Sequence, residues 1–169
     1  TAKGKGKGKG KAKATTIGKR FHLAIQFADL GTHVVARQET STDGEIKNAG
    51  DVTCYSSGSQ AANRGCELWL NTQKAITVKG VPHFLSARTT FVLHQSDRLL
   101  VLKTKVAAEY VVIASAYAPH EEAPPGDKQA FWKLLQDVAS EISIDIIMGD
   151  LNGHVGEYST QWVGSQGFP

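Results

Sequence analysis

Short runs of apolar and β-branched residues, separated by turn-forming residues, make up most of the chain after residue 32. Such runs predict buried or half-buried β-strands. We expect strands over residues 34–36, 52–55, 66–70, 75–78, 91–94, 99–104, 110–117 and 142–148. The breaks between the strands that lie within residues 91–117 are short, so this part of the chain predicts an antiparallel meander.

Two stretches have the apolar period of an amphipathic helix. The first covers residues 18–30 and ends at Gly31. Its expected buried face is Phe21, Ala24, Ile25 and Ala28, with Lys19, Arg20 and Gln26 turned away. The second covers residues 127–140, is capped by Asp127, and has the expected buried stripe Phe131, Leu134, Leu135 and Val138. Helix–strand, meander, helix–strand is an order that predicts half of an α/β sandwich with its helices outside.

Charge divides the chain into two unlike parts. Residues 1–14 contain six lysines and no acidic residue, which leaves 13 basic and 16 acidic residues, a net charge of −3, in the rest. We expect residues 1–16 to be a Lys/Gly-rich, low-complexity tail, without packed structure at least from residue 2 to residue 13, because glycine and like charges both oppose packing. The tail is either a solvated segment or a nonspecific nucleic-acid contact made by counterion release.

The remaining composition, 41% hydrophobic over 169 residues, is that of one globular domain, expected at residues 17–169. Cys54 and Cys66 are too few for a disulfide framework or a zinc site, so we expect an intracellular, reducing compartment, without distinguishing nucleus from organelle. No membrane span or secretory signal is apparent. The absence of an initiator Met leaves open whether the chain is a fragment or a natural short form.

The segment ISIDIIMGDLNGHVG holds the candidate chemistry, because Asp150 and Asn152 follow an apolar strand directly. Two positions two residues apart on an extended chain point the same way. A carboxylate beside an amide suits a hard divalent cation or a water that attacks phosphate. Gly-Asp-x-Asn-Gly is also typical of an ordinary strand-ending turn. Two other strands deliver Glu39, in THVVARQET, and Tyr117, in EYVVIASAYAP.

Together these strand ends resemble the endonuclease/exonuclease/phosphatase superfamily, and most closely its LINE-type retrotransposon and craniofacial development protein 2-like members. The order is similar: an arginine strand (DRLLVLKTK), the YAP strand, an aromatic helix (QAFWKLLQDV) and then GDxNxxVG. The resemblance covers about residues 17–167. It implies a partial four-layer α/β sandwich with mixed, largely antiparallel sheets and outer helices, and a Mg²⁺-dependent endonuclease-type phosphodiesterase activity.

The resemblance also implies a role for each strand-end residue. Glu39 would bind the metal, Asp150 would orient or deprotonate the attacking water, and Asn152 would hydrogen-bond the phosphate. Tyr117 would offer its hydroxyl to a phosphate oxygen. We expect Arg98 to start a strand and pair with a nearby acid, and His154 to be a loop residue.

This sequence departs from the family pattern at both ends. No Asn precedes Asn48, so the Asn of the family's first strand is missing, and the C-terminal Asp-His pair is missing as well. Residues of one catalytic unit act together, so we expect weak or no activity in the chain as given. Half a sandwich would also leave an apolar sheet face uncovered, which predicts a protein partner. The alternative function is therefore a non-catalytic remnant that serves as a structural subunit.

Overall fold

The computed structural model of the protein describes residues 10–59 and 64–153. Its elements, in chain order, are α1 (Gly10–Asp29), β1 (Val34–Gln38), β2 (Ile46–Ala49), β3 (Val52–Ser56), β4 (Cys66–Asn71), β5 (Ile76–Val78), β6 (Val81–His83), the 3₁₀ helix η1 (Ala87–Thr89), β7 (Thr90–Gln95), β8 (Leu99–Val106), β9 (Glu109–Tyr117), α2 (Pro125–Glu141) and β10 (Ile146–Asp150). The predicted strands are all present except the first half of the last one. Strands β2 and β6 are additional.

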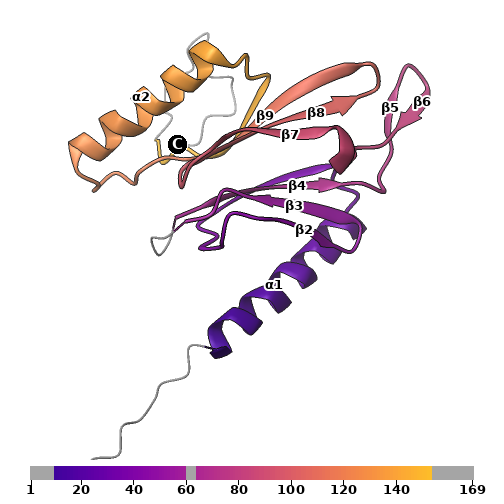
Figure 1. The fold of residues 1–169 in the computed structure, drawn as a ribbon, viewed down its shortest axis with the longest axis horizontal. Coiled ribbons are helices and arrows are strands. Elements are labelled where there is room, and N and C mark those ends of the chain that lie inside the picture. Colours follow the sequence, from indigo (N-terminus) through magenta and orange to yellow (C-terminus); the bar gives the residue numbers. More distant parts are fainter. Residues whose placement is uncertain (1–9, 60–63, 154–169) are drawn as a thin grey trace, which may run out of the picture.

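Two four-stranded sheets, β1-β4-β3-β2 and β10-β9-β8-β7, lie face to face (Figure 1). The inner core draws on both of them: Tyr55, Cys66, Leu68 and Leu70 from the first sheet, and Leu100, Leu102, Ile113 and Tyr117 from the second. The expectation of a largely uncovered inner face is therefore wrong. The strands expected in one half-structure already form both layers, because β1 to β4 fold back as a sheet of their own.

Helix α2 covers the outer face of the second sheet through the predicted stripe. Phe131 and Val138 are buried against Leu99, Val101, Ala114 and Ala116, and Leu134 and Leu135 pack beside them. Pro124, rather than Asp127, is the N-cap residue, and Asp127 lies in the first turn. Ile142 is the C-cap residue, so β10 begins four residues later than expected, at Ile146. Ile142 and Ile144 join the core under the helix instead.

Helix α1 covers the outer face of the first sheet with part of the predicted face, because Ala24 and Ala28 pack there as expected. Ala24 is fully buried against Val52, Cys54 and Trp69, and Leu23 and Phe27 pack beside it. Phe21 and Ile25, which were expected inside, are 48% and 41% exposed, whereas Arg20 is buried. The helix also begins at Gly10, inside the segment expected to lack structure.

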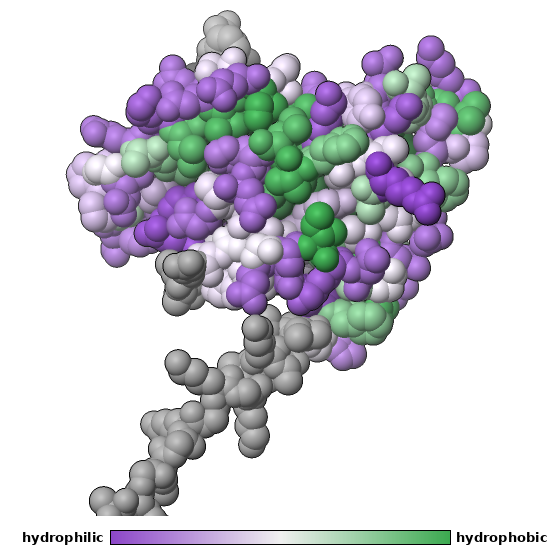
Figure 2. Space-filling model, in the orientation of Figure 1, coloured by the Kyte–Doolittle hydropathy of each residue, from purple (hydrophilic) through white to green (hydrophobic). Residues whose placement is uncertain are grey.

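Strands β7 and β10 are the two edges of the second sheet and both expose apolar side chains. The exposed residues are Phe91, Val92 and Leu93 on β7 and Ile146 and Ile147 on β10. A band of apolar surface runs below helix α2, over this sheet (Figure 2). In the described part of the chain, no helix is long and apolar enough to cross a membrane.

Candidate active site at the rim of the sandwich

The C-terminal ends of β1, β9 and β10 meet at one rim of the sandwich. Strand β10 runs parallel to β9, in a register that places Asp150 beside Tyr117. Strand β1 belongs to the other sheet and contacts both of them. Gln38 at the end of β1 donates from Nε2 to Oγ of Ser115 on β9, at 3.2 Å. This arrangement brings Glu39, Tyr117 and Asp150 to the same rim.

Tyr117 and Glu39 are in direct contact across the two sheets. The Tyr117 hydroxyl donates to Oε1 of Glu39 at 2.6 Å. That hydrogen bond, followed by burial of the ring, raises the pKa of Tyr117, so the phenol stays protonated and remains a donor. Glu39 itself is exposed and has a φ of 56°. Positive φ is uncommon outside glycine and is often found where a functional residue is held in place.

Arg98 precedes β8 and contacts both the backbone and the ring of Tyr117. Its Nη1 donates to the Tyr117 carbonyl at 3.1 Å, and its guanidinium lies 5.3 Å from the centre of the Tyr117 ring. The prediction that Arg98 starts a strand is correct to within one residue. The expected acidic partner is replaced by this carbonyl and ring, since the strand register brings the end of β9 beside the start of β8.

Asp150 and Asn152 form a compact turn after β10. The Asn152 backbone N–H donates to Oδ1 of Asp150 at 2.9 Å, and its Nδ2 donates to the Ala118 carbonyl at 2.7 Å. The backbone of Asn152 has a φ of 46°, a conformation that asparagine tolerates better than most residues. The interpretation of the motif as a strand-ending turn is therefore confirmed, and the turn leaves the exposed Asp150 carboxylate at the rim.

A cavity of about 390 Å³ adjoins this turn, lined by Glu121, Asp150, Leu151, Asn152 and Gly153. It is open to solvent on one side of the candidate site. An amide nitrogen carries two hydrogens, so Asn152 retains one donor after its bond to Ala118. A group bound in this cavity could therefore donate to the Asp150 carboxylate and accept from Nδ2 of Asn152.

Carboxylate oxygens at the rim have the chemistry of a magnesium site. Within residues 10–59 and 64–153, no three His, Cys, Asp or Glu side chains gather as a set of metal ligands. Magnesium, however, usually takes one or two protein carboxylates and keeps several waters. A carboxylate offers about four lone-pair sites, and the hydrogen bond from Tyr117 occupies one of those of Glu39. The donor set therefore fits a hydrated magnesium ion.

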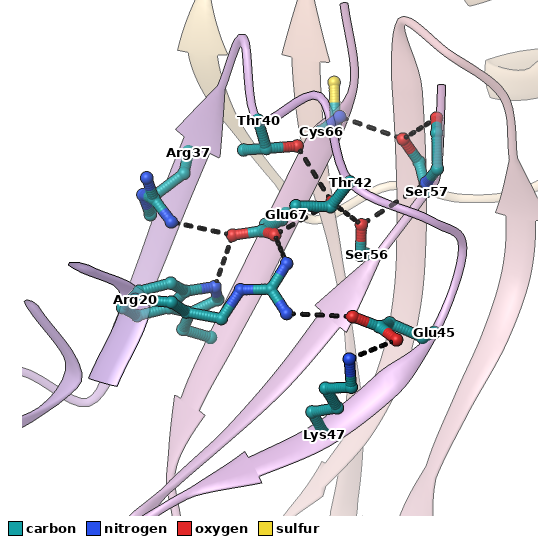
Figure 3. Close-up of polar contacts among 12 residues, drawn as sticks. Arg20, Arg37, Thr40, Thr42, Glu45, Lys47, Ser56, Ser57, Cys66 and Glu67 are labelled. Atoms are coloured by element: carbon teal, nitrogen blue, oxygen red, sulfur yellow. Dashed lines mark hydrogen bonds and ion pairs between the residues drawn. The ribbon is translucent and has the colours of Figure 1, made fainter. Parts of the chain in front are cut away.

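A buried ionic cluster that the sequence prediction did not include lies beside this rim (Figure 3). Glu67, the second residue of β4, is 0% exposed, and its two carboxylate oxygens are surrounded by donors. Arg20 and Thr42 donate to Oε1 at 2.5 and 3.1 Å. Arg37 and the Trp69 indole donate to Oε2 at 2.9 and 2.8 Å. A glutamate within an apolar strand, CELWL, was the available signal, because a buried carboxylate requires partners.

The same cluster holds α1 against the sheet. Arg20 comes from α1 and also bonds Glu45 at 3.0 Å, and Glu45 in turn bonds Lys47 at 2.6 Å. Burial disfavours the charge of Arg20, but the attraction of Glu67 and Glu45 outweighs it, so the pKa of the guanidinium is raised. Arg20 therefore remains charged while buried, which explains why the helix turns this face inward. His154 lies outside the described residues.

Comparison with known proteins gives a likeness of fold. No family model and no curated protein matches the sequence. The endonuclease domain of TRAS1, a telomere-specific non-LTR retrotransposon, is similar with a TM-score of 0.53 and 14% identity, over 78% of this chain and 52% of that one. A TDP2 of D. rerio humanised by 14 mutations is similar with a TM-score of 0.52 and 13% identity, over 83% of this chain and 58% of that one. An endonuclease/exonuclease/phosphatase family protein from Leptotrichia buccalis has a TM-score of 0.47 and 15% identity, over 83% of this chain and 62% of that one.

At these identities the comparison establishes the fold. It is an α/β sandwich of the endonuclease/exonuclease/phosphatase type with mixed, largely antiparallel sheets, as the sequence predicts. The chain spans 52% and 58% of the length of the first two structures.

Proposed function

We propose that this chain contributes a metal-dependent phosphodiesterase site of the DNA-endonuclease type. The observation that supports this most directly is the 2.6 Å hydrogen bond between Tyr117 and Glu39, with Asp150 in register beside Tyr117. This hydrogen bond joins the ends of strands from both sheets. The residues it brings together are those that the sequence predicts for metal binding and phosphodiester hydrolysis. A purely structural polar contact would need no adjacent exposed carboxylate.

Each residue has a role that matches its surroundings. Glu39 would hold Mg²⁺, which when bound neutralises charge on the phosphate. Asp150, exposed at the cavity, would orient the attacking water and accept its proton. The second hydrogen on Nδ2 of Asn152 would stabilise the charge that develops on the phosphate. The protonated phenol of Tyr117 would exchange its bond to Glu39 for one to a phosphate oxygen.

Nicking of supercoiled plasmid DNA in Mg²⁺ tests this proposal. We expect slow nicking by the full chain, and loss of at least about tenfold in rate for Asp150→Asn, because a positioned general base contributes a hundredfold or more. The matched control is Asp137→Asn, which removes an exposed carboxylate from α2 that pairs with Lys133. Nicking that is equal in both variants and the unmodified chain, or insensitive to chelator, would refute the assignment.

The alternative function, a non-catalytic structural subunit, has its own support in the sheet edges. In the described part of the chain, β10 pairs with β9 alone and β1 pairs with β4 alone, so both sheets end on the same side. Ile146 and Ile147 on β10 are 45% and 47% exposed. We propose that a protein partner adds strands along β10, since exposed apolar edge strands favour association.

Sedimentation of residues 10–169, which keep α1 whole, tests the partner. We expect insoluble or oligomeric material, and a specific partner interface would exceed about 1,000 Å². A monodisperse monomer that melts cooperatively would contradict this expectation.

The lysine-rich tail would add weak, nonspecific DNA affinity. When its lysines neutralise phosphates they release counterions from the DNA, so the affinity for DNA should fall steeply as the salt concentration rises. Deletion of residues 1–9 removes four of the six lysines and leaves α1 whole, since the helix begins at Gly10. We expect this deletion to remove most of the salt-sensitive binding measured by fluorescence anisotropy. Unchanged binding would instead assign the DNA contact to the acidic body of the chain.

A further inference from the structure

We infer that Glu67 is a positioning residue for Glu39, and that it acts through the hydroxyl of Thr42. Its buried carboxylate anchors the loop over residues 39–43, which presents the candidate metal ligand. The role of Glu39 as a ligand rests on the proposed function. The coupling between Glu67 and the loop is a separate property of the fold.

The loop needs an external anchor because its backbone is strained. Glu39 and Ser41 have φ values of 56° and 44°, and neither is glycine. A residue other than glycine in this conformation is strained and persists only where surrounding structure imposes the conformation. Glu39 is exposed, so core packing of its own side chain does not impose it.

The contacts of this loop lead back to the beginning of β4. The Ser41 N–H donates to the Arg64 carbonyl at 3.0 Å, and the Thr40 N–H faces the Gly65 carbonyl at 3.4 Å. The Thr42 hydroxyl donates to Oε1 of Glu67 at 3.1 Å and lies 2.5 Å from Oγ of Ser56. Backbone bonds hold both ends of the loop, because the Ser59 N–H also donates to the Thr42 carbonyl at 3.0 Å. Glu67 adds a buried side-chain anchor at Thr42 (Figure 3).

Glu67 is a rigid anchor because all of its hydrogen bonds are made inside the protein. It is fully buried, and Arg20, Arg37 and the Trp69 indole fix both of its oxygens. Satisfied buried networks of this kind define one arrangement of their members. Attachment of α1 to the sheet explains the bond from Arg20, and the pairing of β1 with β4, which places Arg37 opposite Glu67, explains the bond from Arg37. Neither explains the bond from Thr42, which belongs to the loop that follows Glu39.

Amide hydrogen exchange of the full chain without metal tests the coupling. Glu67→Gln is the direct variant, and Thr42→Val tests the same link while keeping both arginine ion pairs. We expect Thr42→Val to speed exchange of the Ser41 amide by at least about tenfold, the effect of one hydrogen bond to a charged group. Thr42→Ser keeps the hydroxyl and should restore the slow exchange of the unmodified chain.

Thr53→Val is the matched control. It removes a threonine hydroxyl that is buried in the first sheet and donates to Asn48 Oδ1 at 3.0 Å, not to the loop. We expect it to leave exchange of Ser41 unchanged. Equal exchange of Ser41 in Thr42→Val and in the unmodified chain would overturn the inference, as would failure of Thr42→Ser to restore protection.

Titration of the same proteins with Mn²⁺, followed by water proton relaxation, separates this inference from the proposed function. If both are correct, Thr42→Val weakens Mn²⁺ binding severalfold and Thr53→Val does not. If the unmodified chain binds no Mn²⁺ but Ser41 still responds to Thr42→Val, the proposed function is wrong and positioning by Glu67 is supported. If Mn²⁺ binds and neither quantity responds to Thr42→Val, positioning is refuted and the proposed function is supported.

Discussion

The Tyr117 hydroxyl lies 2.6 Å from Oε1 of Glu39, although 78 residues separate them and they end strands of different sheets. A carboxylate that accepts this bond has one fewer oxygen lone pair for a cation. Under the proposed function, the contact would therefore compete with metal binding at Glu39. The Tyr117 hydroxyl would then be released to donate to a phosphate oxygen of the substrate.

Tyr117→Phe should separate metal binding from chemistry. Glu39 is exposed, so water replaces the lost donor and the free energy of unfolding should fall by only about 1 kcal/mol or less. Mn²⁺ affinity should be equal or higher, because the competing hydrogen bond is gone, while plasmid nicking should fall at least about tenfold. Urea unfolding, Mn²⁺ relaxation and nicking provide the three measurements. Tyr110→Phe, at a 44% exposed tyrosine, should change none of them.

Arg20→Met should destabilise the protein far more than removal of a surface cation. It keeps the side-chain volume but leaves the buried Glu67 with one arginine fewer, and breaking a buried pair costs about 3–5 kcal/mol. Lys133→Met removes a pair with Asp137 in which the side chains are 75% and 57% exposed, and this should cost under about 0.5 kcal/mol. Urea denaturation compares the two. Similar midpoints for both variants would show that Glu67 does not depend on Arg20.

Arg20 also shows where sequence patterns stop being sufficient. The apolar period of residues 18–30 identifies a helix but places Phe21 and Ile25 inside, because it assigns every arginine to water. Glu67, 47 residues away, supplies the partner that buries Arg20, so Arg20 lies against the sheet while Phe21 is exposed. Such pairing depends on tertiary structure, and no local pattern encodes it.

The sheets were predictable wherever side chains alternate or stay apolar, as at Leu99–Val106 and Glu109–Tyr117. Strand β2, Ile46–Ala49, was missed because IKNA has the composition of a loop and is strand only through its pairing with β3. The shared position of Glu39, Tyr117 and Asp150 at one rim was predictable because these residues directly follow or end strands. Glu67 and Thr42 were not, since their role depends on a contact across 25 residues.

The buried thiols should make the protein sensitive to alkaline conditions. Burial raises the pKa of Cys54 and of Cys66 to about 12. The unfolded chain loses these protons near pH 8.5, so the folded state holds more protons above that pH. Stability should therefore be intact below about pH 8.5 and fall as pH rises towards 12, by up to about 1.4 kcal/mol per pH unit for each thiol.

Urea unfolding at pH 8 and pH 10 measures this loss. Cys66→Ala lowers stability at both values by creating a small cavity, but it should reduce the difference between them. Other effects of high pH on stability act on both proteins alike, so they cancel when the pH difference of the variant is compared with that of the unmodified chain. An identical pH difference in the two proteins would contradict the assignment to Cys66.

Gly149 is the position at which the smallest substitution should do the most damage to the rim. Its φ is 140°, and a Cβ added there would lie 2.0 Å from the Ala116 carbonyl oxygen on β9. Gly149 and Ala116 are paired in the sheet, so neither backbone can move alone and Gly149→Ala has to push β10 away from β9. Asp150, which is held beside Tyr117 by that pairing, should move with it.

We expect Gly149→Ala to lower the unfolding free energy by several kcal/mol, to speed amide exchange along β10, and to abolish nicking even where the protein remains folded. Gly126→Ala is the matched control, because a Cβ there meets nothing within 4 Å and Gly126 lies in the first turn of α2. Replacing glycine by alanine in a helix adds up to about 1 kcal/mol of stability, so this control should be unchanged or slightly more stable. Equal stability and equal nicking in the two variants would mean that β10 does not hold Asp150 against β9, and the site as described would be wrong.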